Sequence, residues 1–76
     1  MKDIKQIIKN ALGIEGRDIT DDDSQDTIAE WDSLGQLSIL TALDKEFDGK
    51  TAEIENLAQA SSVKEFVRIL KKKGII

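Results

Sequence analysis

Apolar residues recur every three or four positions in several stretches of the chain, and this spacing is typical of amphipathic helices. The first stretch lies between Asp3, a favourable N-cap residue, and Gly13, a favourable residue to end a helix. Its apolar face consists of Ile4, Ile7, Ile8, Ala11 and Leu12. The pattern therefore predicts a first helix over residues 4–12.

The strongest periodic pattern spans residues 33–48 and predicts the central helix. Its apolar stripe consists of Leu34, Leu37, Leu40, Leu43 and Phe47, widened by Ile39 and Ala42. We expect this stripe to face the core from Leu34 onward, and Gly49 to end the helix.

The start of the central helix has a capping-box pattern, because Ser33 and Gln36 stand three positions apart. Trp31 and Leu37 are available for an apolar contact beside it. This pattern favours a capping role for the hydroxyl of Ser33.

Two weaker or shorter patterns follow. Residues 50–60 hold Ile54, Leu57, Ala58 and Ala60, and they predict a short, weak helix. Ser62 and Glu65 then form a second capping-box pattern before a final helix that ends near Gly74. The apolar stripe of this final helix consists of Val63, Phe66, Val67 and Leu70.

Residues 14–32 show no helical or strand period and predict a long loop. Its scattered apolar residues Ile14, Ile19, Ile28 and Trp31 are expected to anchor it on the core. A loop of this length in so small a protein is often functional. Asp21–Asp23 suggests calcium, but an EF-hand loop that starts at Asp21 would need Gly at position 26 and Glu at position 32, and both are Asp. A solvated acidic loop is the favoured interpretation, and no metal site is predicted.

Together these patterns predict an all-α fold with three main helices, one short helix and a long first loop. The chain has 76 residues and no proline to interrupt a helix. We expect a small four-helix bundle that forms a single domain over residues 1–76.

Charge and composition narrow the possible functions. The net charge is −4, with eight acids and one arginine between Glu15 and Asp32. The negative charge of this segment argues against nucleic acid as the main partner. It is complementary to a basic surface on a protein partner. Lys71–Lys73 is interpreted as favourable charge at a helix C-terminus. No apolar run approaches the ~20 residues that span a bilayer, so we expect a cytoplasmic protein without membrane insertion. We also expect it to be a monomer.

Catalysis is not predicted. The chain has no histidine and no cysteine, so a serine nucleophile would lack its usual base and no thiolate metal site can form. Its five glycines do not form a phosphate-binding loop.

Ser33 is the candidate functional residue, with two interpretations from the residues alone. It could cap the central helix, which is the commoner role of a serine at such a position. It could also carry a phosphate-linked group, because helix N-termini favour phosphate. Leu34 is expected to anchor the site on the core, and Gly35 to leave room for a bulky adduct.

Asp32-Ser33-Leu34, opening an amphipathic helix after a long loop, resembles the phosphopantetheine attachment motif of acyl and peptidyl carrier proteins. The resemblance extends over nearly the whole chain. It includes the order of the helices and the Leu/Ile pattern through Leu43. It also includes Glu46-Phe47 at the end of the central helix and the final helix around Val63 and Phe66.

The resemblance implies that Ser33, flanked by the motif residues Asp32 and Leu34, is joined to 4′-phosphopantetheine from coenzyme A by a phosphopantetheinyl transferase. The thiol of the arm would hold acyl or aminoacyl groups as thioesters for a loading enzyme and a downstream synthase or transferase. Members of the family can also hold the acyl chain between helices. Leu37, Leu40, Ile54 and Val63 are candidates for such a lining, or plain core residues.

Departures from the family pattern favour a specialised pathway. Carriers of fatty-acid synthases usually have an acid directly after the motif and another one turn later, where this chain has Gly35 and Ser38. We therefore expect a carrier in nonribosomal peptide, polyketide or cell-surface polymer assembly. The alternatives are a carrier in primary fatty-acid synthesis and an unmodified helical interaction module that does not need Ser33.

Overall fold

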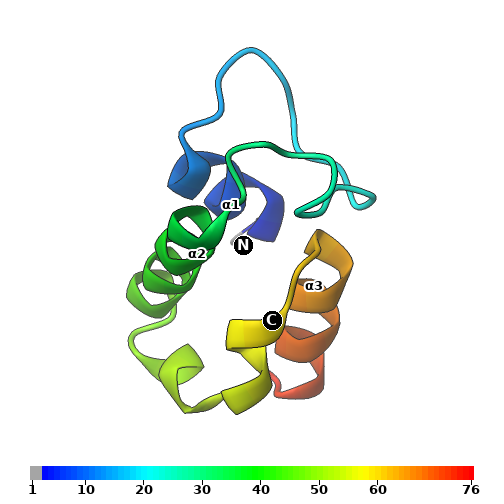
Figure 1. Ribbon diagram of the computed structural model, residues 1–76. Coiled ribbons are helices and arrows are strands. Elements are labelled where there is room, and N and C mark those ends of the chain that lie inside the picture. The colour runs from blue at the N-terminus through cyan, green and yellow to red at the C-terminus, as the bar shows by residue number, and fades with distance from the viewer. Residues whose placement is uncertain (1–2) are drawn as a thin grey trace.

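The computed structural model describes residues 3–76, which fold into helices and connecting loops. The elements in chain order are α1 (Ile4–Leu12), α2 (Ser33–Glu46), the 3-10 helices η1 (Lys50–Glu53) and η2 (Glu55–Gln59), and α3 (Val63–Lys72) (Figure 1). The described residues contain no strand, and the only bridge among them pairs Ser24 with Ser62. The predicted all-α bundle is confirmed.

The first and last helices have the predicted caps. The side chain of Asp3 accepts a hydrogen bond from the backbone of Lys5 at 2.9 Å, and Gly13 ends α1 with a positive φ of 68°. The hydroxyl of Ser62 accepts from the backbone of Glu65 at 3.1 Å. The carboxylate of Glu65 in turn accepts from the backbone of Ser61 at 2.8 Å, one residue earlier than in an ideal capping box.

The predicted short helix is instead two 3-10 turns separated by an extended residue, Ile54 (φ −94°, ψ 100°). The buried residues of this segment lie three positions apart. They are Thr51, Ile54, Leu57 and Ala60. This spacing matches the 3.0 residues per turn of a 3-10 helix, so tighter turns bury these side chains along one edge.

The long loop is anchored as predicted, because Ile14, Ile19, Ile28 and Trp31 are all buried. The ring of Trp31 stacks on that of Phe66, with centroids 6.0 Å apart and an angle of 28°. Phe66 itself is fully buried in the core that the three α-helices share. In Figure 1 the loop leaves α1, passes over the end of the bundle and reaches the start of α3 before it returns to α2.

Candidate functional site

The N-terminus of α2 is capped by Asp32 and not by Ser33. The carboxylate of Asp32 accepts a hydrogen bond from the backbone of Gly35 at 2.9 Å, and its carbonyl accepts from Gln36 at 2.8 Å. The predicted capping role of Ser33, with Gln36 as its capping-box partner, is therefore wrong. A charged carboxylate is the stronger acceptor at the positive end of a helix, which explains why Asp32 takes this position.

Ser33 is consequently the first residue of α2, and its side chain is not used by the cap. The residue is exposed. Its hydroxyl makes no hydrogen bond to any part of the chain that the structure describes. The site therefore presents a free hydroxyl to solvent at a helix N-terminus, where the first backbone N–H groups have no partner within the helix.

The two leucines that follow Ser33 point to solvent. Leu34 is 76% exposed and Leu37 is 61% exposed, so the predicted core stripe is wrong at these two positions. The buried residues of α2 are Gly35, Ile39 and Leu43, spaced by four, of which Ile39 and Leu43 were predicted. The apolar residues of α2 lie on more than one face of the helix. Their spacing alone therefore selected the wrong face at the start of the helix.

Gly35 has a packing role that differs from the predicted one. A Cβ atom at this position would collide with the backbone oxygen of Glu30 and would lie 2.8 Å from a methyl group of Leu12. The glycine thus lets the first turn of α2 approach the loop and α1 closely. Its free side is filled by Glu30 and Leu12, so the glycine does not leave room for an adduct.

Gln36 ties the start of α2 to two other segments. Its Oε1 accepts a hydrogen bond from the indole nitrogen of Trp31 at 2.6 Å. Its Nε2 donates to the backbone oxygens of Ala58 at 3.0 Å and Ala60 at 2.8 Å. The sequence analysis missed this role. The available signal was Trp31, because a buried indole N–H requires an acceptor nearby.

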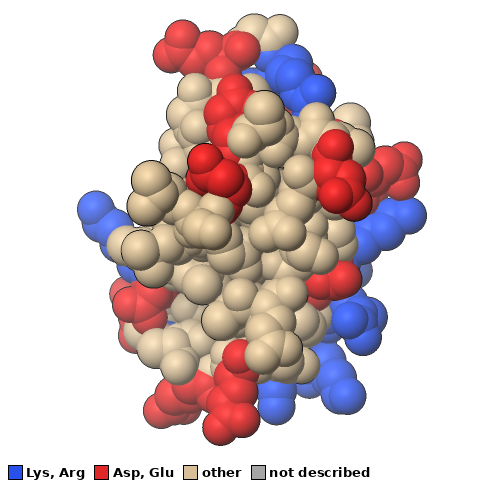
Figure 2. Space-filling view, viewed as in Figure 1, with Lys and Arg blue, Asp and Glu red and all other residues tan. Residues whose placement is uncertain are grey.

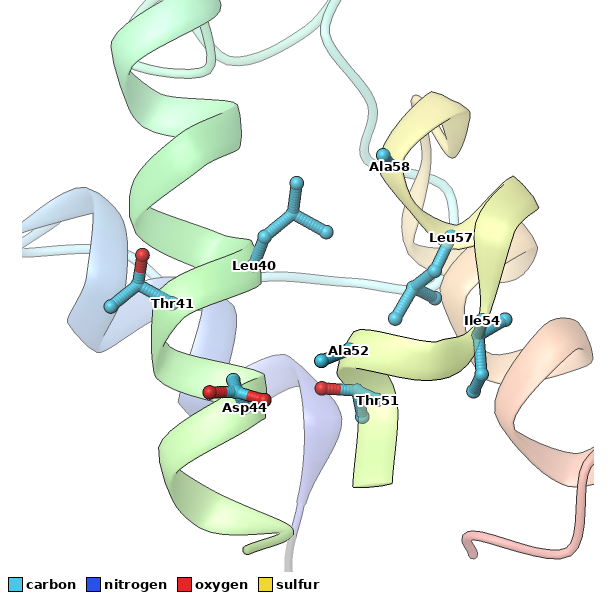
Figure 3. A pocket seen from close by; sticks show the side chains of 8 residues that line it. All are labelled: Leu40, Thr41, Asp44, Thr51, Ala52, Ile54, Leu57 and Ala58. Carbon is cyan, nitrogen blue, oxygen red and sulfur yellow. The ribbon is translucent and has the colours of Figure 1, made fainter. Parts of the chain in front are cut away.

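A pocket of about 280 Å³ lies between α2 and the 3-10 helices (Figure 3). Its lining consists of Leu40, Thr41, Asp44, Thr51, Ala52, Ile54, Leu57 and Ala58. Of the four residues suggested as a cargo lining or plain core, Leu40 and Ile54 line this pocket. Leu37 lies in solvent, and Val63 is fully buried in the core.

The acidic loop pairs many of its carboxylates with bases from the helices. Asp18 lies 3.1 Å from Lys9, Asp21 lies 3.2 Å from Lys5, and Asp22 lies 3.1 Å from Lys64. Within residues 3–76 no three potential metal-ligating side chains come together. The three ion pairs connect the loop to α1 and α3, but their carboxylates are exposed, so each contributes only about 0–1 kcal/mol.

Asp23 is the buried exception in this loop. Its carboxylate accepts hydrogen bonds from the backbone of Thr20 at 2.8 Å, the hydroxyl of Thr27 at 2.8 Å and the guanidinium of Arg17 at 2.9 Å. The backbone hydrogen bond from Thr20 is the largest influence and lowers the pKa of Asp23. Thr27 and Arg17 lower it further, against the opposing effect of burial. The carbonyl of Asp23 also accepts from Val63 at 3.1 Å, which joins the loop to α3.

We expect Asp23→Asn to destabilise the fold by about 1–2 kcal/mol at neutral pH, because it removes a charged acceptor from four donor groups on Thr20, Thr27 and Arg17. The folded-state pKa of Asp23 lies below its unfolded value of about 3.9. Its contribution is therefore fully present above pH ~4 and is lost as the pH falls through the folded pKa. Urea unfolding from pH 7 to pH 2 should show less acid sensitivity in the variant. Asp22→Asn, at an exposed neighbour, is the matched control.

The face that carries α2 and the 3-10 helices is largely uncharged. Figure 2 shows acidic side chains over its upper and lower ends, and lysines and arginines along the side where α3 lies. The first two turns of α2 contain no acidic residue. A partner that approaches Ser33 along α2 would thus meet leucines and small polar side chains. No helix in the described part of the chain is long and apolar enough to cross a membrane.

A family model described as the phosphopantetheine attachment site matches residues 2–70. The chain belongs to this family. Searches among curated proteins and among solved structures gave no match. Members of the phosphopantetheine attachment family bind 4′-phosphopantetheine covalently, so the protein is a phosphopantetheine-carrying protein. The family assignment also implies interaction with a phosphopantetheinyl transferase and with acyl-processing enzymes.

Proposed function

We propose that Ser33 is the residue that carries 4′-phosphopantetheine, with Asp32 and Leu34 as its motif neighbours. The observation that carries this proposal is the free, exposed hydroxyl of Ser33 at the first position of α2. Asp32 takes over the capping role, so a modification of Ser33 would cost the helix no cap. The family match supplies the identity of the group.

The surroundings of Ser33 fit a phosphodiester. Backbone N–H groups in the first turn of α2 and the helix dipole favour negative charge there. In the attachment step, the oxygen of Ser33 attacks the phosphorus that bears the pantetheine group of coenzyme A. An O–P bond forms, the bond to adenosine 3′,5′-bisphosphate breaks, and the hydroxyl proton passes to a base of the transferase.

The bound group would supply a thiol that holds acyl or aminoacyl groups as thioesters. The chain contains no cysteine of its own, so this thiol would be the only one in the protein. The contribution of the chain is to present the cargo at high effective concentration to other enzymes, as a non-catalytic carrier.

The α2 surface supports a specialised pathway over primary fatty-acid synthesis. Leu34 and Leu37 lie exposed next to Ser33, and no acid lies in the first two turns of the helix. We propose that loading and downstream enzymes recognise this surface through apolar contacts more than through basic patches. Nonribosomal peptide, polyketide and cell-surface polymer assembly are the corresponding pathways. We further propose that residues 1–76 act as one cytoplasmic, monomeric carrier domain.

Thiol labelling tests this function directly. The protein is incubated with coenzyme A and a broad-specificity phosphopantetheinyl transferase, freed of coenzyme A, and treated with a maleimide dye. We expect one dye per chain after incubation and none before, because the sequence lacks cysteine. Folded protein that remains unlabelled, beside a control carrier that is labelled, would refute the proposal and favour an unmodified interaction module.

A further inference from the structure

Every exposed residue of α3 is basic. These residues, which we call the α3 cationic face, are Lys64, Arg68, Lys71 and Lys72. The one acid of the helix, Glu65, is half-buried, and its carboxylate accepts a backbone hydrogen bond at the start of the helix. Figure 2 shows lysines and arginines gathered along this side of the molecule. The face therefore presents positive charge without an exposed acid from α3 among it.

Helix stability does not account for this pattern. The helix dipole favours bases in the last turn, where Lys71 and Lys72 lie, and disfavours them in the first turn. Lys64 is nevertheless the second residue of α3. Arg68 lies four residues after Lys64 and four before Lys72, and like charges at this spacing repel each other on a helix surface. The face thus weakens the helix that carries it, which favours a role in binding.

Most of this charge has no partner within the protein. Lys64 lies 3.1 Å from Asp22, but both side chains are mostly exposed, so the ion pair is weak. Among the described residues no carboxylate lies within ion-pair distance of Arg68, Lys71 or Lys72. We call these three residues the unpaired bases. They are available to an anionic partner although the chain as a whole carries a net charge of −4.

The cationic face borders a hollow of about 410 Å³ that also has an apolar contact point. The lining of the hollow consists of Asp21, Lys64, Val67, Arg68 and Lys71. Its apolar member, Val67, is half-buried. The face extends about 12 Å along the helix axis from Lys64 to Lys72, a length that roughly four residues of extended chain cover. These features match a short acidic segment that carries one apolar side chain.

Acids at one end of the hollow favour a narrow partner over a broad one. Asp21 lines the hollow itself, and the exposed Asp22 lies beside Lys64. An anionic membrane or a long phosphate backbone that covered the whole face would meet these carboxylates and be repelled by them. A short peptide segment can instead contact the unpaired bases and end before it reaches Asp21.

We propose that the α3 cationic face binds a short acidic segment of a partner protein, whose carboxylates contact the unpaired bases and whose apolar side chain packs on Val67. The site is separate from Ser33, because α2 and α3 stand on different sides of the bundle in Figure 1. A partner held on α3 would leave the start of α2 accessible and raise its own effective concentration there. Binding to α3 does not depend on the attachment proposed for Ser33.

A peptide titration of the unmodified, isotope-labelled protein tests this proposal. The probe is Glu-Glu-Leu-Glu-Glu with blocked ends, and we expect its amide chemical-shift changes to concentrate on residues 64–72. The affinity should fall at least about fivefold when the salt concentration rises from about 20 mM to about 200 mM. Glu-Glu-Ser-Glu-Glu should bind about threefold more weakly, because it loses the contact with Val67. No shift changes, or changes centred on α2, would overturn the proposal.

Arg68→Glu and Lys45→Glu form a matched pair of variants. Both positions are exposed bases on helices, and both substitutions change the net charge equally. We expect Arg68→Glu to weaken peptide binding at least about fivefold and Lys45→Glu to change it less than about 1.5-fold. Lys71→Glu is a second variant on the face and should weaken binding at least about threefold. Equal losses at positions 45 and 68 would show a response to net charge alone and overturn the site.

The stability of the same variant separates a binding role from a structural one. Arg68→Glu replaces two repulsive pairs, with Lys64 and Lys72, by attractive ones, so the urea midpoint should rise while binding weakens. A lower midpoint would show that Arg68 serves the fold and would overturn the interpretation. Sedimentation with vesicles of phosphatidylglycerol and phosphatidylcholine, at a salt concentration where the peptide causes no shift changes, would assign the face to a membrane and overturn the peptide proposal.

Discussion

Ser33→Ala is expected to abolish attachment of phosphopantetheine while it leaves the fold nearly unchanged. The variant removes the only oxygen at which we place the new bond. The cap of α2 remains, because Asp32 and not Ser33 accepts the hydrogen bond from Gly35. The free energy of unfolding should therefore change by less than about 0.5 kcal/mol, as for other exposed positions. Intact mass and a urea titration measure the two effects.

Ser38→Ala is the matched control for this variant. Ser38 is an exposed serine on the same helix, five residues further along. It should accept the group at the wild-type rate if the transferase recognises Ser33. Asp32→Ala tests the cap separately and should cost about 1 kcal/mol of stability. Modification of the Ser33→Ala protein, at any other residue, would contradict the site assignment.

Gly35→Ala is expected to destabilise the protein by about 3 kcal/mol, because the new methyl group must displace packed atoms. Its Cβ would collide with the backbone oxygen of Glu30 and would press on Leu12. A chain of 76 residues has a total stability of roughly 4–11 kcal/mol, so a loss of this size removes a large part of it. Equilibrium unfolding in urea, followed by helical circular dichroism, measures the change.

The sign of this effect distinguishes close packing from simple helix propensity. Alanine is favoured over glycine within a helix by about 1 kcal/mol when nothing obstructs the side chain. If Gly35 served only to leave space, Gly35→Ala would stabilise the protein. Ser38→Ala, at an exposed position of the same helix, should be neutral or mildly stabilising. A stabilised Gly35→Ala protein would contradict the close approach of α2 to the loop.

Helices with a clear cap and one apolar face were predictable from the sequence. The bounds of α1 follow from Asp3, its isoleucine spacing and Gly13. The start of α3 follows from Ser62 and Glu65. In both cases local hydrogen bonds and a single buried stripe specify the element, so tertiary contacts do not change the outcome.

The orientation of α2 was not predictable in the same way. Asp32 and Ser33 are adjacent candidates for the cap, and both residue types favour that position. The buried face depends on Gly35, whose close contact with Glu30 arises only when the loop folds over the helix. A glycine carries no apolar signal, so the exposed leucines dominated the pattern.

The role of Asp23 in the acidic loop was also not predictable from the sequence. Asp21, Asp22 and Asp23 are identical in type, yet only Asp23 is buried. Its donors, Thr20 and Thr27, are brought together by turns that no periodic pattern reveals. The sequence therefore predicted a solvated acidic loop but missed the carboxylate that organises it.

The candidate site was located from the sequence by resemblance, because residue patterns alone left Ser33 between a cap and an attachment point. The structure assigns the cap to Asp32 and leaves the Ser33 hydroxyl free. Leu40 and Ile54, two of the four residues suggested by resemblance as a cargo lining, lie at the pocket between α2 and the 3-10 helices. The rest of the lining depends on how α2 faces η1, which the sequence does not reveal.

The central claim is tested most directly by the intact mass of the protein before and after incubation with coenzyme A and a phosphopantetheinyl transferase. We expect a gain of one phosphopantetheinyl group, and fragmentation of the product should place it on Ser33. An unchanged mass for folded protein beside an active control reaction, or a group located on another residue, would contradict the assignment of Ser33.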